Sequence, residues 1–340
     1  MSEFEFAGLP LGLGCAPLGN LYRAMSAEQA LGTVRAAFAA GLRLFDTAPY
    51  YGLGLSERRL GDALRELPRD EFLLSTKVGR LLQPDTSPVL AAERHGFFTP
   101  MPFHVAYDYS YDGFMRSYEA SLQRLGLARI DILLVHDLGR ATHGDDNVRH
   151  FADFANGGYR ALDELRRAGD IAAIGLGANE WAVMAEAMAV GRFDCFLLAG
   201  RYTLLEQEPL DQFLPLCAAH GAKVIVGGAY NSGILATGTR GEARPYYNYE
   251  PAPVEIIDRV ARIEAVCDRH DVTLAAAALQ FPLAHPVVSA VIPGLGNPAM
   301  VTMTTALYRE PIPDAFWSDL KGEGLLAQDA PVPVACSVAA

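Results

Sequence analysis

The sequence predicts an α/β protein built as a single (β/α)8 TIM barrel. Eight short, apolar, strand-like runs alternate with helical stretches along the 340 residues. Strict alternation implies a parallel sheet, and a count of eight strands suggests that this sheet closes into a barrel. Hydrophobic residues make up 51% of the chain, which is ample for one large core, and no linker-like composition divides it. We therefore expect residues 1–340 to form one domain.

The strands are predicted where apolar runs end on a polar residue or a glycine-rich turn. Largely apolar runs of this kind suit parallel strands that are buried on both faces. The eight strands are expected at residues 11–18, 42–46, 72–78, 130–137, 171–179, 194–202, 223–230 and 289–294.

The helices are indicated by capping residues and by apolar positions at helical spacing. Ser26 and Gln29 form a capping box at the start of the first helix, and Gly41 ends it. Residues 311–326 follow the last helix as a C-terminal extension. The later helices are expected near residues 56–66, 114–126, 159–168, 254–269, 273–283 and from strand eight to Tyr308.

Three long loops at the C-terminal face of the barrel are expected to shape a substrate pocket, together with the C-terminal extension. They cover residues 79–112, 138–156 and 237–251. The first is too long for a structureless connection, so we expect it to be part of a lid over the substrate. Three tyrosines of the third loop either line the pocket or pack within the loop: Tyr246, Tyr247 and Tyr249.

Composition and charge exclude several classes of partner. The formal net charge is −12 and no basic cluster is present, which argues against nucleic acid and anionic membranes. Residues 1–10 do not form a signal peptide, and no apolar run approaches the roughly 20 residues of a membrane span. The five cysteines are scattered without metal-ligand spacing. We expect a cytoplasmic protein that binds a small molecule and no metal; the sequence predicts no particular oligomeric state.

Four chemically reactive side chains stand at or just beyond the ends of three consecutive strands. Asp46 and Tyr51 follow strand two, Lys77 ends strand three and His136 ends strand four. In a closed barrel these ends converge, so the four side chains can meet. The set suggests proton transfer at an alcohol or carbonyl oxygen. An ammonium would lower the phenol pKa from its usual value of about 10, a carboxylate would hold that ammonium, and a histidine would orient the reacting oxygen.

Each of these residues also has a purely structural interpretation. Lys77 and Asp46 could form a buried salt bridge, because a lysine at a buried strand end is costly unless it is paired. His136 could be a hydrogen-bonded core histidine, and Tyr51 a packed loop residue. Gly12 and Gly14 do not form a dinucleotide-binding fingerprint, since the third glycine of that motif is missing.

Five segments resemble the aldo-keto reductase family, and the resemblance runs along nearly the whole chain. The family implies a (β/α)8 barrel that binds a nicotinamide dinucleotide without a Rossmann domain. It further implies that Tyr51 donates or accepts the proton, that Lys77 and Asp46 tune it, and that His136 orients the substrate oxygen. The segments are FDTAPYYG at 45–52, STKV at 75–78, LLVHD at 133–137, IGLGAN at 174–179 and VIPG at 291–294.

Three further segments resemble one branch of that family, which contains L-fucose (D-threo-aldose) 1-dehydrogenase and pyridoxal 4-dehydrogenase. Enzymes of this branch oxidise a cyclic hemiacetal to a lactone. Removal of the hydroxyl proton in such a reaction drives the hydride onto the nicotinamide. The segments are YDYSYDG at 107–113, LLAGRYTLLEQ at 197–207 and ALQFPLAHP at 278–286.

The resemblance also assigns cofactor-binding positions. Asn179 would hold the nicotinamide carboxamide and Tyr202 would stack on its ring, whereas Ala178 and Ala199 replace the family's usual Ser and Gln. The pyrophosphate region is carried over to Ser232, Gly233 and Leu235, and the segment after strand eight to Pro293, Gly294, Leu295 and Gly296.

The segment after strand eight predicts the choice of dinucleotide. NADP-preferring relatives place a lysine or arginine there to pair with the 2′-phosphate. Residues 294–298 contain no cation, and none follows before Arg309. We therefore expect NAD to be preferred over NADP.

The leading hypothesis is NAD-dependent oxidation of a small lactol, either an aldose such as L-fucose or D-arabinose, or pyridoxal. A general NADPH-dependent aldehyde or ketone reductase is the second hypothesis, and the absent cation disfavours it. A non-catalytic, cofactor-sensing subunit is the third. The intact set of Asp46, Tyr51, Lys77 and His136 disfavours that reading.

Overall fold

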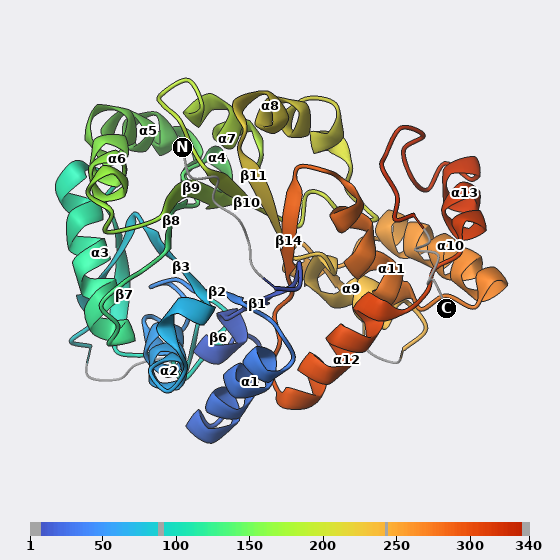
Figure 1. Cartoon of the computed structure of the whole chain (residues 1–340), viewed down its shortest axis with the longest axis horizontal. Coiled ribbons are helices and arrows are strands. Elements are labelled where there is room, and N and C mark those ends of the chain that lie inside the picture. The colour runs from blue at the N-terminus through green and yellow to red at the C-terminus, as the bar shows by residue number, and fades with distance from the viewer. Residues whose placement is uncertain (1–7, 88–91, 242–243, 335–340) are drawn as a thin grey trace.

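The computed structural model describes residues 8–87, 92–241 and 244–334, and within them the chain forms an eight-stranded parallel barrel (Figure 1). The strands follow one another around the barrel in chain order. They are β1 (Gly12–Gly14), β2 (Leu44–Asp46), β3 (Leu73–Val78), β8 (Ile132–His136), β9 (Ala173–Ala178), β10 (Cys195–Ala199), β11 (Lys223–Gly227) and β14 (Val288–Ile292). The predicted fold class and all eight strands are confirmed, and each strand is shorter than predicted.

The ring of strands closes between β14 and β1. Leu11 and Val291 form one isolated parallel bridge, and Gly14 and Gly294 form another. The amide of Gly14 donates a hydrogen bond to the carbonyl of Pro293 at 2.9 Å. The backbone after β14 is therefore joined to the C-terminal end of β1.

Helices cover the outside of the strands (Figure 1). At the start of the first helix the Ser26 hydroxyl accepts the amide of Gln29, as the capping box predicts. The Gln29 side chain donates instead to the carbonyl of Gly296. The outer helices are α1 (Ala27–Ala39), α2 (Leu55–Leu64), α3 (Tyr111–Leu125), α6 (Tyr159–Ala168), α7 (Ala182–Ala187), α8 (Phe213–His220), α11 (Leu274–Gln280) and α12 (Pro298–Arg309).

The connections carry additional short elements. The second long loop contains α4 (Arg140–His143), α5 (Asn147–Asp153) and a π-helical turn, η4 (Phe154–Gly158). After β11 come η6 (Asn231–Gly233), α9 (Ile234–Thr237) and the hairpin β12 (Tyr246–Tyr247) and β13 (Glu250–Pro251), followed by α10 (Val254–His270). The C-terminal extension forms α13 (Asp314–Gly322), which packs against α10, where the ring of Phe316 lies against that of His270.

The connection after β3 has its own strands, which is why its length does not conflict with a compact fold. β4 (Arg80–Pro84) pairs antiparallel with β7 (Phe103–Tyr107), and a second small hairpin joins β5 (Glu93–Arg94) to β6 (Phe97–Phe98). Phe97 also forms an antiparallel bridge with Leu21 in the loop after β1. This segment is therefore tied across the mouth of the barrel, consistent with the predicted cover.

Alternation along the strands explains both the apolar runs and the placement of the polar residues. In β8, Ile132 and Leu134 face the barrel interior, while Leu133 and Val135 pack under the helices. The next inward position is His136. Leu44 and Leu73 line the same interior, so the inward positions that continue β2 and β3 to their C-terminal ends are Asp46 and Lys77.

None of the helices in the described ranges combines the length and the apolar character needed to cross a bilayer. The four cysteines that the structure describes are unpaired and buried: Cys15, Cys195, Cys217 and Cys267. Cys336 and residues 1–7, which entered the sequence argument, lie outside the described residues.

Candidate active site

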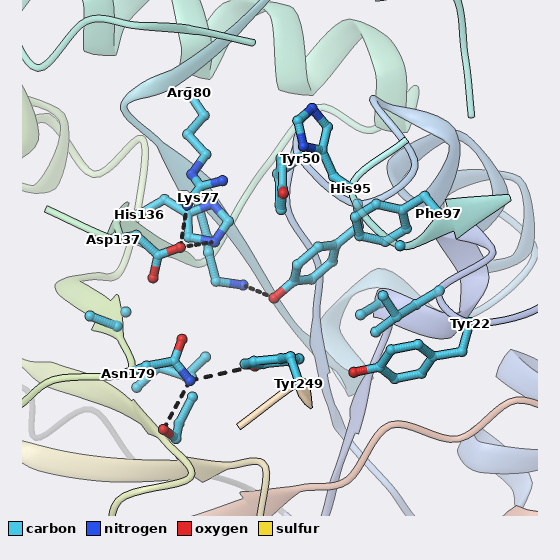
Figure 2. A pocket seen from close by; sticks show the side chains of 18 residues that line it. Tyr22, Tyr50, Lys77, Arg80, His95, Phe97, His136, Asp137, Asn179 and Tyr249 are labelled. Carbon is cyan, nitrogen blue, oxygen red and sulfur yellow. Dashed lines mark hydrogen bonds and ion pairs between the residues drawn. The ribbon is translucent and has the colours of Figure 1, made fainter. Parts of the chain in front are cut away.

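A pocket of about 490 Å³ opens at the C-terminal ends of the strands (Figure 2). Strands β3, β8, β9 and β10 supply its floor through Lys77, His136, Gly177 and Leu197. The loops after β1, β2 and β3 supply an aromatic wall of Tyr22, Tyr50, Tyr51 and Phe97. The pocket thus lies where the ends of parallel barrel strands place functional residues in other proteins of this fold.

Lys77 is the centre of a buried polar network. Its side chain is 2% exposed, and its ammonium donates to Oδ2 of Asp46 at 2.7 Å and to the carbonyl of Thr47 at 2.8 Å. The other oxygen of Asp46 accepts from the Ser75 hydroxyl at 2.8 Å. The Lys77–Asp46 salt bridge of the structural interpretation is therefore present, and both of its charges are hydrogen-bonded.

The same ammonium also reaches the pocket. It donates to the hydroxyl of Tyr51 at 3.2 Å, and it lies 4.8 Å from the centre of that ring. The loop that carries Tyr51 rests directly on the turn after β1. A Cβ added to Gly19 would lie 2.5 Å from the carbonyl carbon of Tyr51, and one added to Gly52 would lie 2.4 Å from the carbonyl oxygen of Gly19. The two backbones are therefore in contact, and this contact positions the phenol.

Burial and charge act in opposite directions on the Tyr51 phenol. Burial raises its pKa, the Lys77 charge lowers it and the Asp46 charge raises it, with a net value of about 12. Lys77 therefore acts on Tyr51 in the direction that the sequence predicted. The expectation of a net pKa below 10 is nevertheless wrong for the protein without cofactor, because desolvation outweighs the lysine charge.

Lys77 itself stays charged. Burial alone would lower the pKa of Lys77, but the charges of Asp46 and Tyr51 and their hydrogen bonds outweigh it, so the net shift is upward. Burial raises the pKa of Asp46, and Lys77 and Ser75 oppose that rise. The ammonium is therefore a fixed positive charge beside the phenol.

His136 stands next to Tyr51 as a neutral imidazole. The two ring centres are 6.0 Å apart and nearly perpendicular. Burial, followed by the charges of Arg80 and Lys77, lowers the pKa of His136 well below its usual value. Oδ2 of Asp137 lies 3.5 Å from Nε2 of His136, and an acceptor in this position favours the tautomer protonated at Nε2.

Asp137 and Arg80 were not singled out from the sequence, and both line the pocket. They form an ion pair beside His136. Asp137 follows His136 directly at the strand end, a position that could have marked it. Arg80 follows β3 after Gly79 alone, at the start of β4, a position that could have marked it as well.

Of the two residues predicted to contact the nicotinamide, one lines the pocket and the other does not. Asn179 lines the pocket beside Ala178 and Ala199, and its amide donates to the carbonyl of Ala199 at 3.2 Å and to Tyr249 at 3.4 Å. Tyr202, by contrast, is 0% exposed and packs 5.2 Å from the ring of Phe281, away from the pocket lining. Stacking of Tyr202 on a nicotinamide stays a prediction, and this conformation shows no such access.

The sequence left open whether the three tyrosines of the third loop line the pocket or pack within the loop, and they differ in this respect. Tyr249 lines the pocket. Tyr247 packs against the hydrophobic core, and Tyr246 is half exposed. The amide of Tyr249 donates to the hydroxyl of Ser232 at 2.9 Å, which ties this loop to the predicted pyrophosphate region.

The predicted phosphate-binding residues lie after β11 and after β14. Ser232 and Gly233 have positive φ values of 61° and 104°, and a Cβ added to Gly233 would meet nothing within 4 Å. Leu235 is fully buried behind them. Backbone with this conformation and open space in front can approach an anion closely.

The segment after β14 is held against the loop after β1. Pro293 and Gly294 bond to Gly14, and Leu295 is 1% exposed. A Cβ added to Gly296 would lie 2.9 Å from a guanidinium nitrogen of Arg23. The sequence argument found no cation in this segment. It missed Arg23, which comes from a distant part of the chain and has no hydrogen bond or ion pair within the described ranges.

Comparisons with known proteins show the family of this chain. The family model of the Aldo/keto reductase family matches residues 10–322. The chain is 45% identical to a pyridoxal 4-dehydrogenase of Microbacterium luteolum over 93% of this chain and 94% of that protein. It is 40% identical to a D-threo-aldose 1-dehydrogenase of a Pseudomonas species, over 91% and 92% of the two chains.

A solved structure supports the same fold. An aldo/keto reductase from Klebsiella pneumoniae, in complex with NADP and acetate, superposes with a TM-score of 0.66 at 20% identity, covering 96% of this chain and 95% of that one. The class, an NAD(P)-dependent oxidoreductase, is shown by the family match and by the two dehydrogenase relatives. The family match and the two relatives show that the chain belongs to the aldo/keto reductase family.

The residues present fit a nicotinamide dinucleotide. Asn179 presents a side-chain amide to the pocket, as a carboxamide partner requires. Two further groups lie beyond it, on the side of β11 and β14: the backbone at Gly233, which has open space beside it, and the guanidinium of Arg23, which has no partner among the described residues. Asn179, Ser232, Gly233 and the segment 293–296 are thus the residues that would hold the cofactor.

Proposed function

We propose that this protein oxidises a small cyclic hemiacetal to its lactone with NAD, and that the substrate is an aldose such as L-fucose or D-arabinose. One observation carries the proposal: the buried Lys77 ammonium bridges Asp46 and the hydroxyl of Tyr51 at the floor of the pocket. The relative that is 40% identical, a D-threo-aldose 1-dehydrogenase, supports the substrate class.

In this mechanism Tyr51 is the general base. The substrate hydroxyl lies within hydrogen-bond reach of Tyr51 and of Nε2 of His136, which donates to it and sets its orientation. When bound, the oxidised dinucleotide supplies the hydride acceptor and a positive ring charge. A positive charge in this pocket lowers the pKa of Tyr51 in the same direction as Lys77, so it opposes the effect of burial.

We propose a preference for NAD over NADP, on the ground that residues 294–298 carry no cation. A 2′-phosphate binds best to a cationic, bidentate partner. Arg23 is the group that tests this proposal, because its guanidinium stands beside Gly296. If NADP were used better than NAD, and if Arg23→Ala removed that advantage, Arg23 would be the missing cation and the proposal would be wrong.

Pyridoxal is the second candidate substrate. The relative that is 45% identical is a pyridoxal 4-dehydrogenase, and a planar aromatic ring suits a pocket lined by Tyr22, Tyr50, Phe97 and Tyr249. Its hemiacetal would give a pyridoxolactone by the same proton and hydride transfers. Reduction of simple aldehydes with NADPH and a non-catalytic sensing role are the remaining alternatives.

The experiment is a comparison of initial rates with NAD and with NADP at mildly alkaline pH. The substrates are L-fucose, D-arabinose, L-galactose and pyridoxal. We expect lactol oxidation with NAD, and we expect Tyr51→Phe to lower kcat by roughly 10² to 10⁴ while leaving cofactor binding unchanged. Tyr50→Phe is the matched control, because that phenol lines the pocket without a hydrogen bond to Lys77 among the described residues.

Three outcomes would contradict the proposal. Reduction of simple aldehydes with NADPH, without lactol oxidation, would favour the reductase. Cofactor binding without any turnover would favour a sensor. Full activity in Tyr51→Phe would remove Tyr51 from the mechanism.

We also propose that the protein works in the cytoplasm, since the cysteines in the described ranges are all unpaired.

A further inference from the structure

The Arg80–Asp137 pair is the one charged group of the pocket lining that the proposed mechanism leaves without a direct role. The Arg80 side chain is 6% exposed, whereas that of Asp137 is 19% exposed. Both side chains line the pocket, and the carboxylate is the more exposed of the two. Burying two charges costs desolvation free energy, so we looked for a function of this ion pair in the pocket.

Arg80 is held rigidly. Its guanidinium carbon lies 4.2 Å from the centre of the Tyr50 ring and 5.5 Å from that of Tyr107, in two cation–π contacts. It belongs to β4, a strand outside the barrel sheet. Closure of the barrel therefore does not require this ion pair.

Asp137 is held in an unusual backbone conformation. Its φ is 48°, in the left-handed region that non-glycine residues seldom occupy, and its amide donates to the carbonyl of Gly177 at 2.8 Å. Such a conformation costs free energy and tends to occur where a side chain is aimed at a site. Here the reversal of the chain after β8 directs the carboxylate toward the pocket.

The two carboxylate oxygens differ. Oδ2 carries the contacts to Arg80 and to Nε2 of His136, and both dashed lines in Figure 2 meet on that atom. Oδ1 has no hydrogen-bond partner among the residues that the structure describes, and Asp137 belongs to the pocket lining. A carboxylate oxygen with no partner at a pocket wall is a strong acceptor for a hydroxyl group.

The position of this oxygen relative to the reacting atom suggests its ligand. A substrate oxygen bonded to Tyr51 and His136 must lie within roughly 3 Å of each. The Asp137 carboxylate is adjacent to the same His136 nitrogen, so a group on the carbon next to the reacting one can reach it. In an aldose lactol this carbon carries a hydroxyl group.

We propose that Asp137, backed by Arg80, binds the hydroxyl group on the carbon adjacent to the reacting carbon, and so selects 2-hydroxylated lactols over their 2-deoxy analogues. This inference rests on the proposed function and narrows its substrate class. Asp137 acts here as a specificity residue, and the proton and hydride transfers stay with Tyr51, Lys77 and His136.

The test compares D-arabinose with 2-deoxy-D-ribose, which is its 2-deoxy analogue. In Asp137→Asn, Arg80 fixes the amide oxygen, so an NH₂ donor replaces the accepting Oδ1 at the pocket wall. Asparagine also tolerates a positive φ. We expect the ratio of kcat/KM for the two sugars to fall roughly tenfold, with the rate on the deoxy sugar nearly unchanged.

A matched control is available in Glu57. This residue forms a buried ion pair with Arg124, between α2 and α3 outside the barrel and away from the pocket lining. Glu57→Gln makes the same chemical change at a structural pair, and we expect it to lower thermal stability without changing the sugar ratio. Should Asp137→Asn fail to fold, Asp137→Gly, which suits the same φ, gives the same comparison.

The outcomes separate this inference from the proposed function. An unchanged sugar ratio in Asp137→Asn overturns the inference and leaves lactol oxidation standing. If the wild-type protein oxidises neither sugar, the proposed function fails, and calorimetric binding of both sugars to the cofactor complex decides the inference instead. A preference for D-arabinose that Asp137→Asn abolishes supports it. Equal binding of the two sugars, or no binding of either, overturns it.

Discussion

The phenol of Tyr51 combines two requirements that conflict at neutral pH. In the proposed reaction it lies buried beside the hydride-transfer centre, and burial makes it a weaker acid. Lys77 offsets part of that effect from 3.2 Å, and it remains charged because Asp46 is paired with it. Removing the charge of Lys77 would therefore raise the pKa of Tyr51 without moving the phenol far.

This balance predicts a pH dependence. The pKa of Tyr51 in the free protein is about 12, so the protonated form dominates below that pH and the phenolate fraction rises tenfold with each pH unit up to it. We expect kcat/KM for oxidation to rise from about pH 7 to 10, and Lys77→Met to shift the profile to higher pH. Measured profiles for oxidation and reduction test this; an oxidation rate independent of pH over that range would contradict Tyr51 as the base.

Sequence reasoning was strongest for residues whose position follows from strand alternation. Asp46, Lys77 and His136 all continue the inward face of an apolar strand, so their convergence was predictable. Arg23 was not, because a loop whose path depends on tertiary contacts brings it to Gly296, and Arg80 lies beyond the inward-facing run of β3, after the turn at Gly79. The pKa of Tyr51 was also not predictable, since it depends on how much water the aromatic wall excludes.

At the scale of secondary-structure elements, the second long loop supports the end of β8 from behind. Its helix α4 carries His143, whose Nε2 lies 2.8 Å from the Tyr109 hydroxyl. That hydroxyl donates to the carbonyl of His136 at 2.8 Å. The loop therefore holds the backbone at His136, the residue that we propose orients the substrate.

The same loop predicts sensitivity to acid. Burial, and then the charges of His150 and Arg80, lower the pKa of His143 to about 4 from the 6.5 of an unfolded chain. The unfolded state therefore binds more protons between these values, and stability falls as pH decreases from 6.5 to about 4. We expect His143→Gln to be less stable at neutral pH but to lose less stability across this window, as thermal melts at several pH values would show. An unchanged pH slope would contradict the role of His143.

The predicted helices and strands were recovered with small errors at their ends, and the errors have a common cause. Each strand was predicted too long, because its apolar run continues beyond the last hydrogen bond to the neighbouring strand. The residues beyond that point are buried without being part of the sheet, as Ala229 and Tyr202 are. The short helices α4, α5 and α9 have no amphipathic period long enough to be read from the sequence.

At the scale of the whole molecule, the barrel depends on a close approach between its first, second and last strands. A Cβ added to Gly12 would lie 2.7 Å from Cγ2 of Ile292 and 2.8 Å from the carbonyl oxygen of Leu44. The interior has no room for it. Closure of the ring therefore restricts this position to glycine.

We expect Gly12→Ala to destabilise the protein by about 1–3 kcal/mol through overpacking. Gly32→Ala is the matched control: its Cβ would meet only Cγ of Pro298 at 3.7 Å, and alanine favours the helix α1 by about 1 kcal/mol. Denaturant unfolding of both variants tests this. Equal or opposite shifts would show that the ring tolerates a side chain at β1.

The contact between Gly19 and the loop of Tyr51 has a consequence for how such a protein can diversify. Two backbones that touch leave no space for a side chain at either glycine, so the proton-transfer loop cannot be remodelled by point substitutions there. The hairpins after β3 and β11 supply Phe97 and Tyr249 to the pocket, and none of the glycines described in these two connections meets another backbone so closely. New substrates can therefore be accommodated by exchanging these hairpins, while the chemistry of the floor is inherited unchanged.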